Sequence, residues 1–141
     1  MEENKNKYCG CLYYSASALA RQITKMADEA FSPTGMSPSY AFLLMIVNEH
    51  PGIQPGDIAI KMQLTPSTVT RLIDKLEHKG FLERTAEGRT TRVQPTKKSM
   101  ELQDKLVEAW QSLYHRYVAI LGEEDSRKLT NMCYEAYLKL A

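Results

Sequence analysis

Apolar residues recur at spacings of three and four along most of the chain, which is the pattern of helices that bury one face. This spacing predicts a long first helix over Tyr8–Phe31, and Ser32–Gly35 then breaks the pattern. Ser37 can cap a second helix with Pro38 at its first position, and His50–Gly52 ends it. The first third of the chain is therefore expected to be helical.

Two shorter helices are predicted next, over Pro55–Met62 and over residues 66–79. Thr65 is a good N-cap, Pro66 suits the first helical position because its missing N–H costs nothing there, and Gly80 is a good stop. The apolar residues of the second helix fall within one arc: Val69, Leu72, Ile73 and Leu76. Hydroxyl and charged side chains occupy the opposite side.

Two short helices joined by a tight turn, with a second member faced by hydroxyls and an arginine, indicate a helix-turn-helix whose second helix enters the major groove of DNA. The segments 81–85 and 89–94 then predict two strands around the turn Ala86–Gly88. A basic hairpin directly after a recognition helix is a wing. The sequence thus predicts a winged helix-turn-helix.

The last third of the chain predicts a long helix over Lys97–Leu121 and a final helix after Gly122, both with an apolar face. The long helices carry more apolar surface than a small winged module can cover, which favours a homodimer in which they interlock. The expected fold is mainly α with a small β-hairpin wing. Its parts are an N-terminal dimerisation helix at 1–35, the DNA-binding domain at 36–96 and C-terminal dimerisation helices at 97–141.

The net charge of +1 is unevenly distributed. Residues 61–98 contain nine Lys or Arg against four Asp or Glu, which gives this stretch a charge of +5 and leaves −4 for the remainder. A positive surface on the part predicted to read DNA is what phosphate binding requires.

Other classes of function have little support in the sequence. The histidines stand far apart, and neither a phosphate-binding glycine loop nor a nucleophile motif occurs, so an enzyme is not expected. The single Cys-x-Cys lacks a matching second pair, so no metal or cofactor is expected. Three cysteines form no disulfide framework, and no stretch has the length and apolarity of a membrane span; a cytoplasmic protein is expected.

The stretch Ser67–Arg84 resembles the recognition-helix region of the MarR family of bacterial and archaeal transcription regulators. The family pattern has a hydroxyl-rich opening, Thr-Arg, an apolar pair, Leu, and then Gly before an apolar pair and Glu-Arg; here these are Ser67-Thr68-Val69-Thr70-Arg71-Leu72-Ile73, Leu76 and Gly80-Phe81-Leu82-Glu83-Arg84. The resemblance extends over about residues 36–106. The wing departs more, because Glu87-Gly88-Arg89 replaces the usual Asp-x-Arg and the wing is shorter.

The resemblance implies roles for individual residues on double-stranded DNA. Arg71 is expected to read a base, because a guanidinium can pair bidentately with guanine. Arg89 is expected to enter the minor groove, and Lys75 to contact the backbone. The remaining expected contacts are hydroxyls and cations near phosphates or in the major groove: Ser37, Ser39, Ser67, Thr68, Thr70, Arg84 and Arg92.

The resemblance also implies a repressor that binds a pseudo-palindromic operator and is released by a small aromatic or anionic inducer. In this family the inducer binds between the dimer helices and the winged module. Aromatic side chains that could line such a cleft are Tyr13, Phe31, Tyr40 and Trp110, although most of them are better explained by core or dimer packing.

Two alternatives remain open. Cys9-Gly10-Cys11-Leu12-Tyr13 resembles the first-helix segment of the organic-hydroperoxide-sensing branch of the family, which makes Cys9 a candidate redox sensor; a further tyrosine expected in that helix is missing. The winged fold can also serve as a protein-interaction module without DNA binding. The basic stretch and the hydroxyl and arginine face argue against this second alternative.

Overall fold

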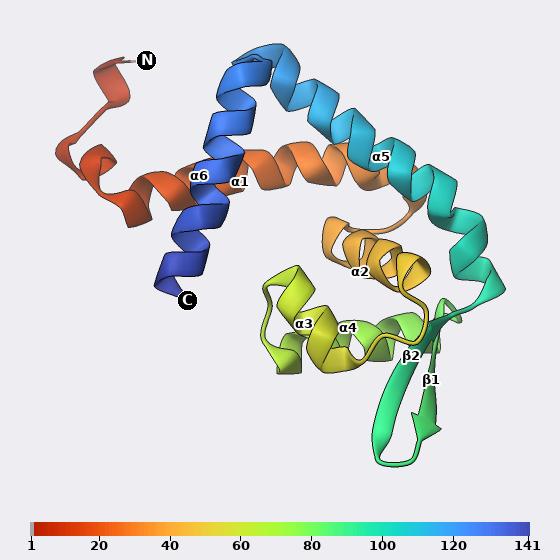
Figure 1. The fold of residues 1–141 in the computed structure, drawn as a ribbon. Coiled ribbons are helices and arrows are strands. Elements are labelled where there is room, and N and C mark those ends of the chain that lie inside the picture. Colours follow the sequence, from red (N-terminus) through yellow and green to blue (C-terminus); the bar gives the residue numbers. More distant parts are fainter. Residues whose placement is uncertain (1) are drawn as a thin grey trace. The chain divides into compact units, whose positions relative to one another are not determined.

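The computed structural model describes residues 2–141. This part of the chain forms six α-helices and one two-stranded antiparallel hairpin (Figure 1). In chain order the elements are α1 Leu12–Phe31, α2 Pro38–Glu49, α3 Pro55–Met62, α4 Pro66–His78, β1 Leu82–Glu87, β2 Thr90–Pro95, α5 Lys97–Leu121 and α6 Glu123–Leu140. The expected fold class, mainly α with a small hairpin wing, is confirmed. None of the helices in residues 2–141 has the length and hydropathy needed to cross a bilayer.

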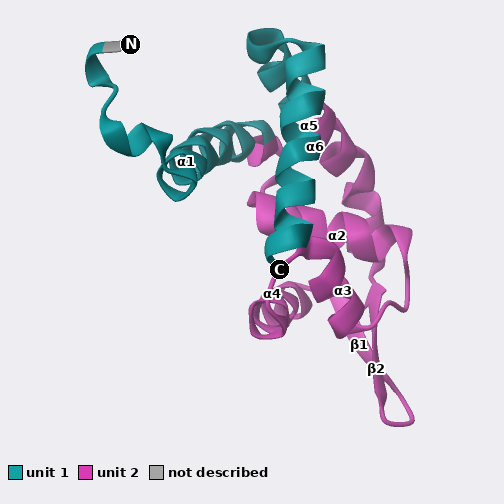
Figure 2. Ribbon diagram, turned by 60° about the vertical axis from the view of Figure 1, so that its left-hand side comes forward, with its two compact units in different colours: residues 1–30, 112–141 teal, residues 31–111 magenta. Residues whose placement is uncertain are grey.

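The chain divides into two compact units (Figure 2). Unit 1 contains residues 1–30 and 112–141, and unit 2 contains residues 31–111. Unit 2 therefore extends beyond the expected DNA-binding domain at both ends and includes the first half of α5. The extension into α5 is explained by burial, because the side chains of Ser99 and Leu106 in this helix are removed from solvent.

The first helix begins four residues later than predicted. Residues Lys7–Gly10 form a 3-10 turn, and Cys11 is extended, with φ −88° and ψ 126°. The Ser15 hydroxyl donates to the Cys9 carbonyl, which gives that carbonyl a partner outside a regular helix. The peroxide-sensing alternative places Cys9 and Tyr13 in the same first helix. In the structure Cys9 lies in the preceding 3-10 turn, and only Tyr13 belongs to α1.

The core of unit 2 is built on α2. Leu43, Leu44 and Val47 have no exposed surface, and α2 is apolar around most of its circumference. A helix of this kind must be covered on several sides. Ile58 of α3 and Ile73 of α4 are likewise fully buried. The apolar sides of these two helices therefore hold the helix-turn-helix in the core of unit 2.

The hairpin pairs Leu82 with Pro95 at its base and Glu87 with Thr90 at its tip. The turn is therefore Gly88–Arg89, two residues long, and Arg89 lies in the turn instead of opening the second strand as predicted. At the base, Ile53 forms an isolated antiparallel bridge with Val93. This bridge fixes the wing to the segment between α2 and α3.

The base of the wing depends on a glycine. Gly52 has φ +86°, and its N–H donates to the Val93 carbonyl at 2.9 Å. A Cβ atom at this position would lie 3.2 Å from Nε2 of Gln94. We expect Gly52→Ala to lower the free energy of unfolding by about 1–2 kcal/mol, because the substitution combines a left-handed backbone with a close contact.

Urea unfolding measures this effect, and Gly56→Ala is the matched control. Gly56 lies in α3 and has open space where a Cβ would be added. Its substitution should leave stability unchanged or raise it slightly, because alanine favours a helix. Equal midpoints for the two variants would contradict the importance of the Gly52 geometry.

Candidate nucleic-acid interface

Helix α4 has the ends that its sequence predicts. Thr65 is its N-cap, and the Thr65 hydroxyl accepts from the Thr68 N–H at 3.4 Å. Pro66 occupies the first helical position. Beyond the last turn, the Gly80 N–H donates to the Glu77 carbonyl and the Phe81 N–H to the Leu76 carbonyl. These are the two hydrogen bonds of a Schellman motif, and Gly80 has the left-handed φ of +82° that this motif requires.

One side of α4 is buried and the other faces solvent. Val69, Ile73 and Leu76 have no exposed surface, and Leu72 is half-buried. Burying three such side chains orients the helix about its own axis, since each contributes about 1.5–3 kcal/mol. The predicted DNA-contacting residues of this helix lie on the remaining surface, half-buried at Thr68 and exposed at Ser67, Thr70, Arg71 and Lys75.

The hydroxyls at the start of α4 are linked to one another. The Thr65 and Thr68 hydroxyl oxygens are 2.8 Å apart, and Nη2 of Arg71 lies 3.5 Å from the Thr68 hydroxyl. The Thr70 hydroxyl donates to the Pro66 carbonyl at 3.0 Å, so its proton is used within the helix. Arg71 makes only this one long contact among those found in residues 2–141, which leaves most of its donors free for a ligand.

Arg84 of β1 is bound to two carboxylates of α4. Its Nη2 lies 2.5 Å from Asp74 Oδ1, and its Nη1 lies 2.7 Å from Glu77 Oε1. The Arg84 N–H also donates to Glu77 Oε2 at 2.9 Å. These bonds tie the first wing strand to the exposed side of the recognition helix. The contact of Arg84 with a phosphate stays a prediction, and the structure adds this second role.

Sequence reasoning missed the two carboxylates in this network. Their spacing of three residues places Asp74 and Glu77 on neighbouring parts of the same helix surface, which is a signal visible in the sequence. Their common partner lies seven residues beyond Glu77, across the Gly80 stop. Only the geometry of the turn after α4 shows that Arg84 returns to them.

The wing holds its two predicted arginines differently. Arg89 lies exposed in the turn, whereas the Arg92 Nε donates to Glu87 Oε2 at 3.0 Å. Nη1 of Arg92 also donates to the Gly52 carbonyl at 3.2 Å. Glu87 therefore braces Arg92 across the hairpin, and not Arg89, the residue that the family pattern would pair with this acidic position.

Ser37 and Ser39 lie at the start of α2, and both are exposed. Ser37 is the N-cap residue, but its side chain makes no capping hydrogen bond. Its hydroxyl is therefore not occupied by the first turn of the helix. All ten predicted DNA-contacting residues belong to unit 2.

The four aromatic residues predicted to line an inducer cleft have different environments. Phe31 is fully buried, and its ring packs against Phe42 with centroids 5.5 Å apart, so it is a core residue. Trp110 is 52% exposed. Tyr40 lies beside a cation, because its ring centroid is 6.0 Å from Lys79 Nζ. Tyr13 is 81% exposed and belongs to unit 1, whereas the other three residues belong to unit 2.

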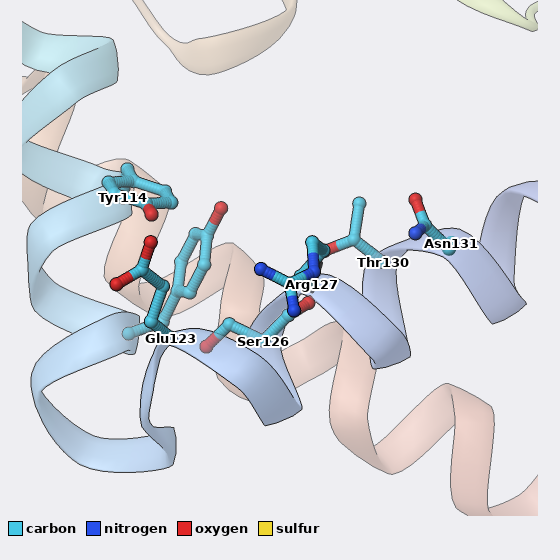
Figure 3. A pocket seen from close by; sticks show the side chains of 7 residues that line it. Tyr114, Glu123, Ser126, Arg127, Thr130 and Asn131 are labelled. Atoms are coloured by element: carbon cyan, nitrogen blue, oxygen red, sulfur yellow. Dashed lines mark hydrogen bonds between the residues drawn. The ribbon is translucent and has the colours of Figure 1, made fainter.

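Unit 1 contains a pocket that the sequence did not predict (Figure 3). It has a volume of about 230 Å³ and lies between the end of α5 and the start of α6. Its lining combines two tyrosines, one carboxylate, one arginine and three small polar side chains: Tyr114, Tyr117, Glu123, Ser126, Arg127, Thr130 and Asn131. None of the four predicted aromatic residues belongs to this lining.

Within residues 2–141 the cysteines form neither a disulfide nor part of a metal-binding cluster. Cys9 is half-buried, Cys11 and Cys133 are exposed, and all three are free thiols. Within the same range, no group of three or more His, Cys, Asp or Glu side chains is arranged to hold a metal ion. Redox sensing by Cys9 stays a prediction.

Comparisons with known proteins agree with this geometry. Residues 36–88 match the model of the MarR family. The HTH-type transcriptional repressor MdtR of Bacillus subtilis is 29% identical over 114 residues, which cover 79% of this chain and 74% of MdtR. The HTH-type transcriptional regulator YwhA of the same species is 36% identical over 61 residues, which cover 43% of this chain and 44% of YwhA.

Solved structures share the fold. The Staphylococcus aureus MepR–DNA complex has a TM-score of 0.79 at 19% identity, with 97% of this chain and 100% of that chain covered. CouR from Rhodococcus jostii RHA1, bound to p-coumaroyl-CoA, has a TM-score of 0.78 at 19% identity, with 94% and 96% covered. The relatives MdtR and YwhA are transcriptional regulators and not enzymes. With its hydroxyl- and arginine-faced α4, its basic wing and these matches, residues 36–88 form a winged helix-turn-helix of the MarR family, and the chain is similar to DNA-binding transcriptional regulators of that family.

Proposed function

We propose that this protein binds a pseudo-palindromic operator in double-stranded DNA as a homodimer and represses transcription until a small aromatic or anionic inducer binds. The observation that carries the proposal is the exposed face of α4, where Ser67, Arg71 and Lys75 project from a helix whose back is buried. A helix oriented in this way can lie in the major groove with its side chains against base edges.

Different residues serve reading and positioning in this proposal. Arg71 reads a base because its guanidinium keeps free donors, and Lys75 binds a phosphate further along the helix. Arg89 is exposed at the tip of the wing and enters the neighbouring minor groove. Arg92, held by Glu87, approaches a phosphate. Ser37 and Ser39 offer hydroxyls to the backbone at the start of α2.

The distribution of apolar side chains supports the homodimer. Unit 1 contributes only three of the twenty buried apolar residues found in the described part of the chain: Ala27, Ala30 and Leu113. It contributes fourteen of the eighteen large apolar side chains that are exposed there. Exposed apolar surface on this scale marks an association surface, and a second copy presents the same surface in return.

Repression and induction rest on relatives. MdtR is named a transcriptional repressor, and the CouR structure contains a bound coenzyme A ester. By analogy, the inducer of this protein would be a small aromatic or anionic molecule that favours a spacing of the two α4 helices unsuited to the operator.

We expect Arg71→Ala to relax sequence preference and to weaken operator binding by about 1–3 kcal/mol, because it removes a bidentate base contact. Lys75→Ala is the contrast, since loss of a phosphate contact weakens binding to all sequences alike and lowers the salt slope by about one. Fluorescence anisotropy with operator and scrambled duplexes over a salt series measures both. If the wild-type protein binds no duplex DNA at any salt concentration, this proposal is refuted. The alternative of a protein-interaction module without DNA binding would then be favoured.

The homodimer is tested with two isoleucines of equal exposure. Ile120 of unit 1 and Ile60 of unit 2 are both 76% exposed. We expect Ile120→Glu to shift the protein toward monomer in analytical ultracentrifugation, because the charge would be buried in the interface. Ile60→Glu should leave the dimer intact. The same oligomeric state in both variants, or a monomeric wild type, would refute the assignment of unit 1 as the dimer surface.

The role of Arg84 in positioning α4 is tested by a double-mutant cycle. Arg84→Met and Glu77→Gln should show a coupling free energy of about 1 kcal/mol in urea unfolding, because the charged hydrogen bonds are part of a network. The cycle of Lys128 and Glu124, an exposed pair one helical turn apart in α6, is the control and should give about 0.3–0.5 kcal/mol. A coupling for Arg84 no larger than this control counts against a bracing role.

A further inference from the structure

The C-terminal end of the recognition helix α4, called its exit below and made up of residues 79–81, is bound by residues at the start of α5. Within α4 and its Schellman motif, the carbonyls of Lys75, Leu76 and Glu77 accept hydrogen bonds from the turn that follows. The carbonyls of Lys79 and Gly80, which follow His78, have partners outside this turn. Carbonyls at a helix end need such partners, and the identity of the partner determines what the end is attached to.

Lys98 supplies one partner. Its Nζ donates to the Lys79 carbonyl at 2.9 Å and lies 4.4 Å from the ring centroid of Phe81. Lys98 stands in the first turn of α5, where a cation is unfavourable for the dipole of its own helix. The C-terminal end of α4 is the opposite pole, and there the same cation is favourable. The position of Lys98 is therefore explained by α4 and not by α5.

Thr96 supplies the second partner. Its hydroxyl donates to the Gly80 carbonyl at 2.6 Å, and its N–H donates to the Phe81 carbonyl at 3.1 Å. The same hydroxyl oxygen accepts from the Ser99 N–H at 3.4 Å, so one side chain caps α5 and binds the exit of α4. The two helix ends are joined through a single residue.

The start of α5 is in turn attached to the core helix α2. Asn48 and Ser99 are both buried. The Ser99 hydroxyl donates to Asn48 Oδ1 at 2.7 Å, and Asn48 Nδ2 donates to the Ser99 carbonyl at 3.2 Å and to Gln103 Oε1 at 2.8 Å. A buried polar network in which every member is bonded specifies one arrangement, since any shift leaves a buried group without its partner.

We propose that Lys98 is a positioning residue for DNA recognition: with Thr96 it clamps the C-terminal end of α4 to the first turn of α5, so that α4 takes the direction that α5 sets. The inference rests on the proposed function, because direction matters only if α4 lies in a groove. It assigns to Lys98 a contribution to selectivity without contact to a base. If the direction of α5 changes, the recognition helix α4 changes direction with it.

The adjacent lysine provides the control. Lys97 is 90% exposed at its side chain and pairs only loosely with Glu101, at 3.8 Å. Lys98→Met and Lys97→Met remove the same charge one residue apart, so any loss of general attraction to phosphates is common to both. The probes are an operator selected from random duplex DNA by the wild-type protein and a non-operator duplex of equal length.

We expect Lys98→Met to lower the ratio of operator to non-operator affinity by about threefold to tenfold, as for loss of a favourable charged contact at a helix end. Lys97→Met should leave the ratio within twofold of wild type, and Lys98→Arg should restore most of it. Thermal melting should be similar for all three variants. Equal ratios for Lys98→Met and Lys97→Met, or an equal loss on both duplexes, would overturn the proposal.

A second measurement tests the clamp without DNA. Amide hydrogen exchange of Gly80 and Phe81 should be faster in Lys98→Met than in Lys97→Met, because the exit of α4 is less well held. Unchanged exchange at these amides would also overturn the proposal. If the clamp is found by exchange but the wild-type protein selects no DNA sequence, the proposed function fails and the local geometry stands.

Discussion

The burial of one side of α4 is the constraint on which the interface depends. Val69, Ile73 and Leu76 are fully removed from water, and together they determine which residues of the helix remain outside. Rotating α4 by one residue would expose one of these side chains and bury a charged or hydroxyl group. The apolar packing thus selects the surface offered to a ligand, although it contributes no atom to it.

Orientation about the helix axis is only part of what groove binding needs, because the direction of the axis must also be held. Polar contacts supply this second restraint from two sides. Arg84 binds Asp74 and Glu77 from the wing strand, and Lys98 binds the Lys79 carbonyl from α5. Each contact is modest by itself at a solvent-exposed site, and their value lies in joining three separate elements at one end of α4.

Much of this fold could be predicted from the sequence because its signals are local. Thr65, Pro66 and Gly80 mark the ends of α4, and the apolar spacing of Val69, Ile73 and Leu76 marks its buried side. The family resemblance was confirmed on the same residues. Local signals of this kind depend on a few neighbouring positions, so tertiary structure had little opportunity to override them.

The errors and omissions involve contacts between distant residues or weak helix signals. The first helix was predicted to start at Tyr8, but Gly10 has a low helix propensity and an extended Cys11 precedes the true start. The wing departs from the family pattern at Glu87, so the sequence identified no partner for this residue, and the structure shows that Arg92 binds it across the hairpin. Lys98 was not singled out, because nothing in its immediate neighbours shows that α4 ends beside it.

The exposed front of α4 has a consequence for the evolution of such proteins. Ser67 and Lys75 are exposed and do not belong to the core, and Arg71 has a single long contact within the protein. Substitutions at these positions therefore have little effect on folding. Duplicated genes for a protein of this kind can acquire new target sites through a few changes on one helix, while selection for stability acts on a separate set of residues.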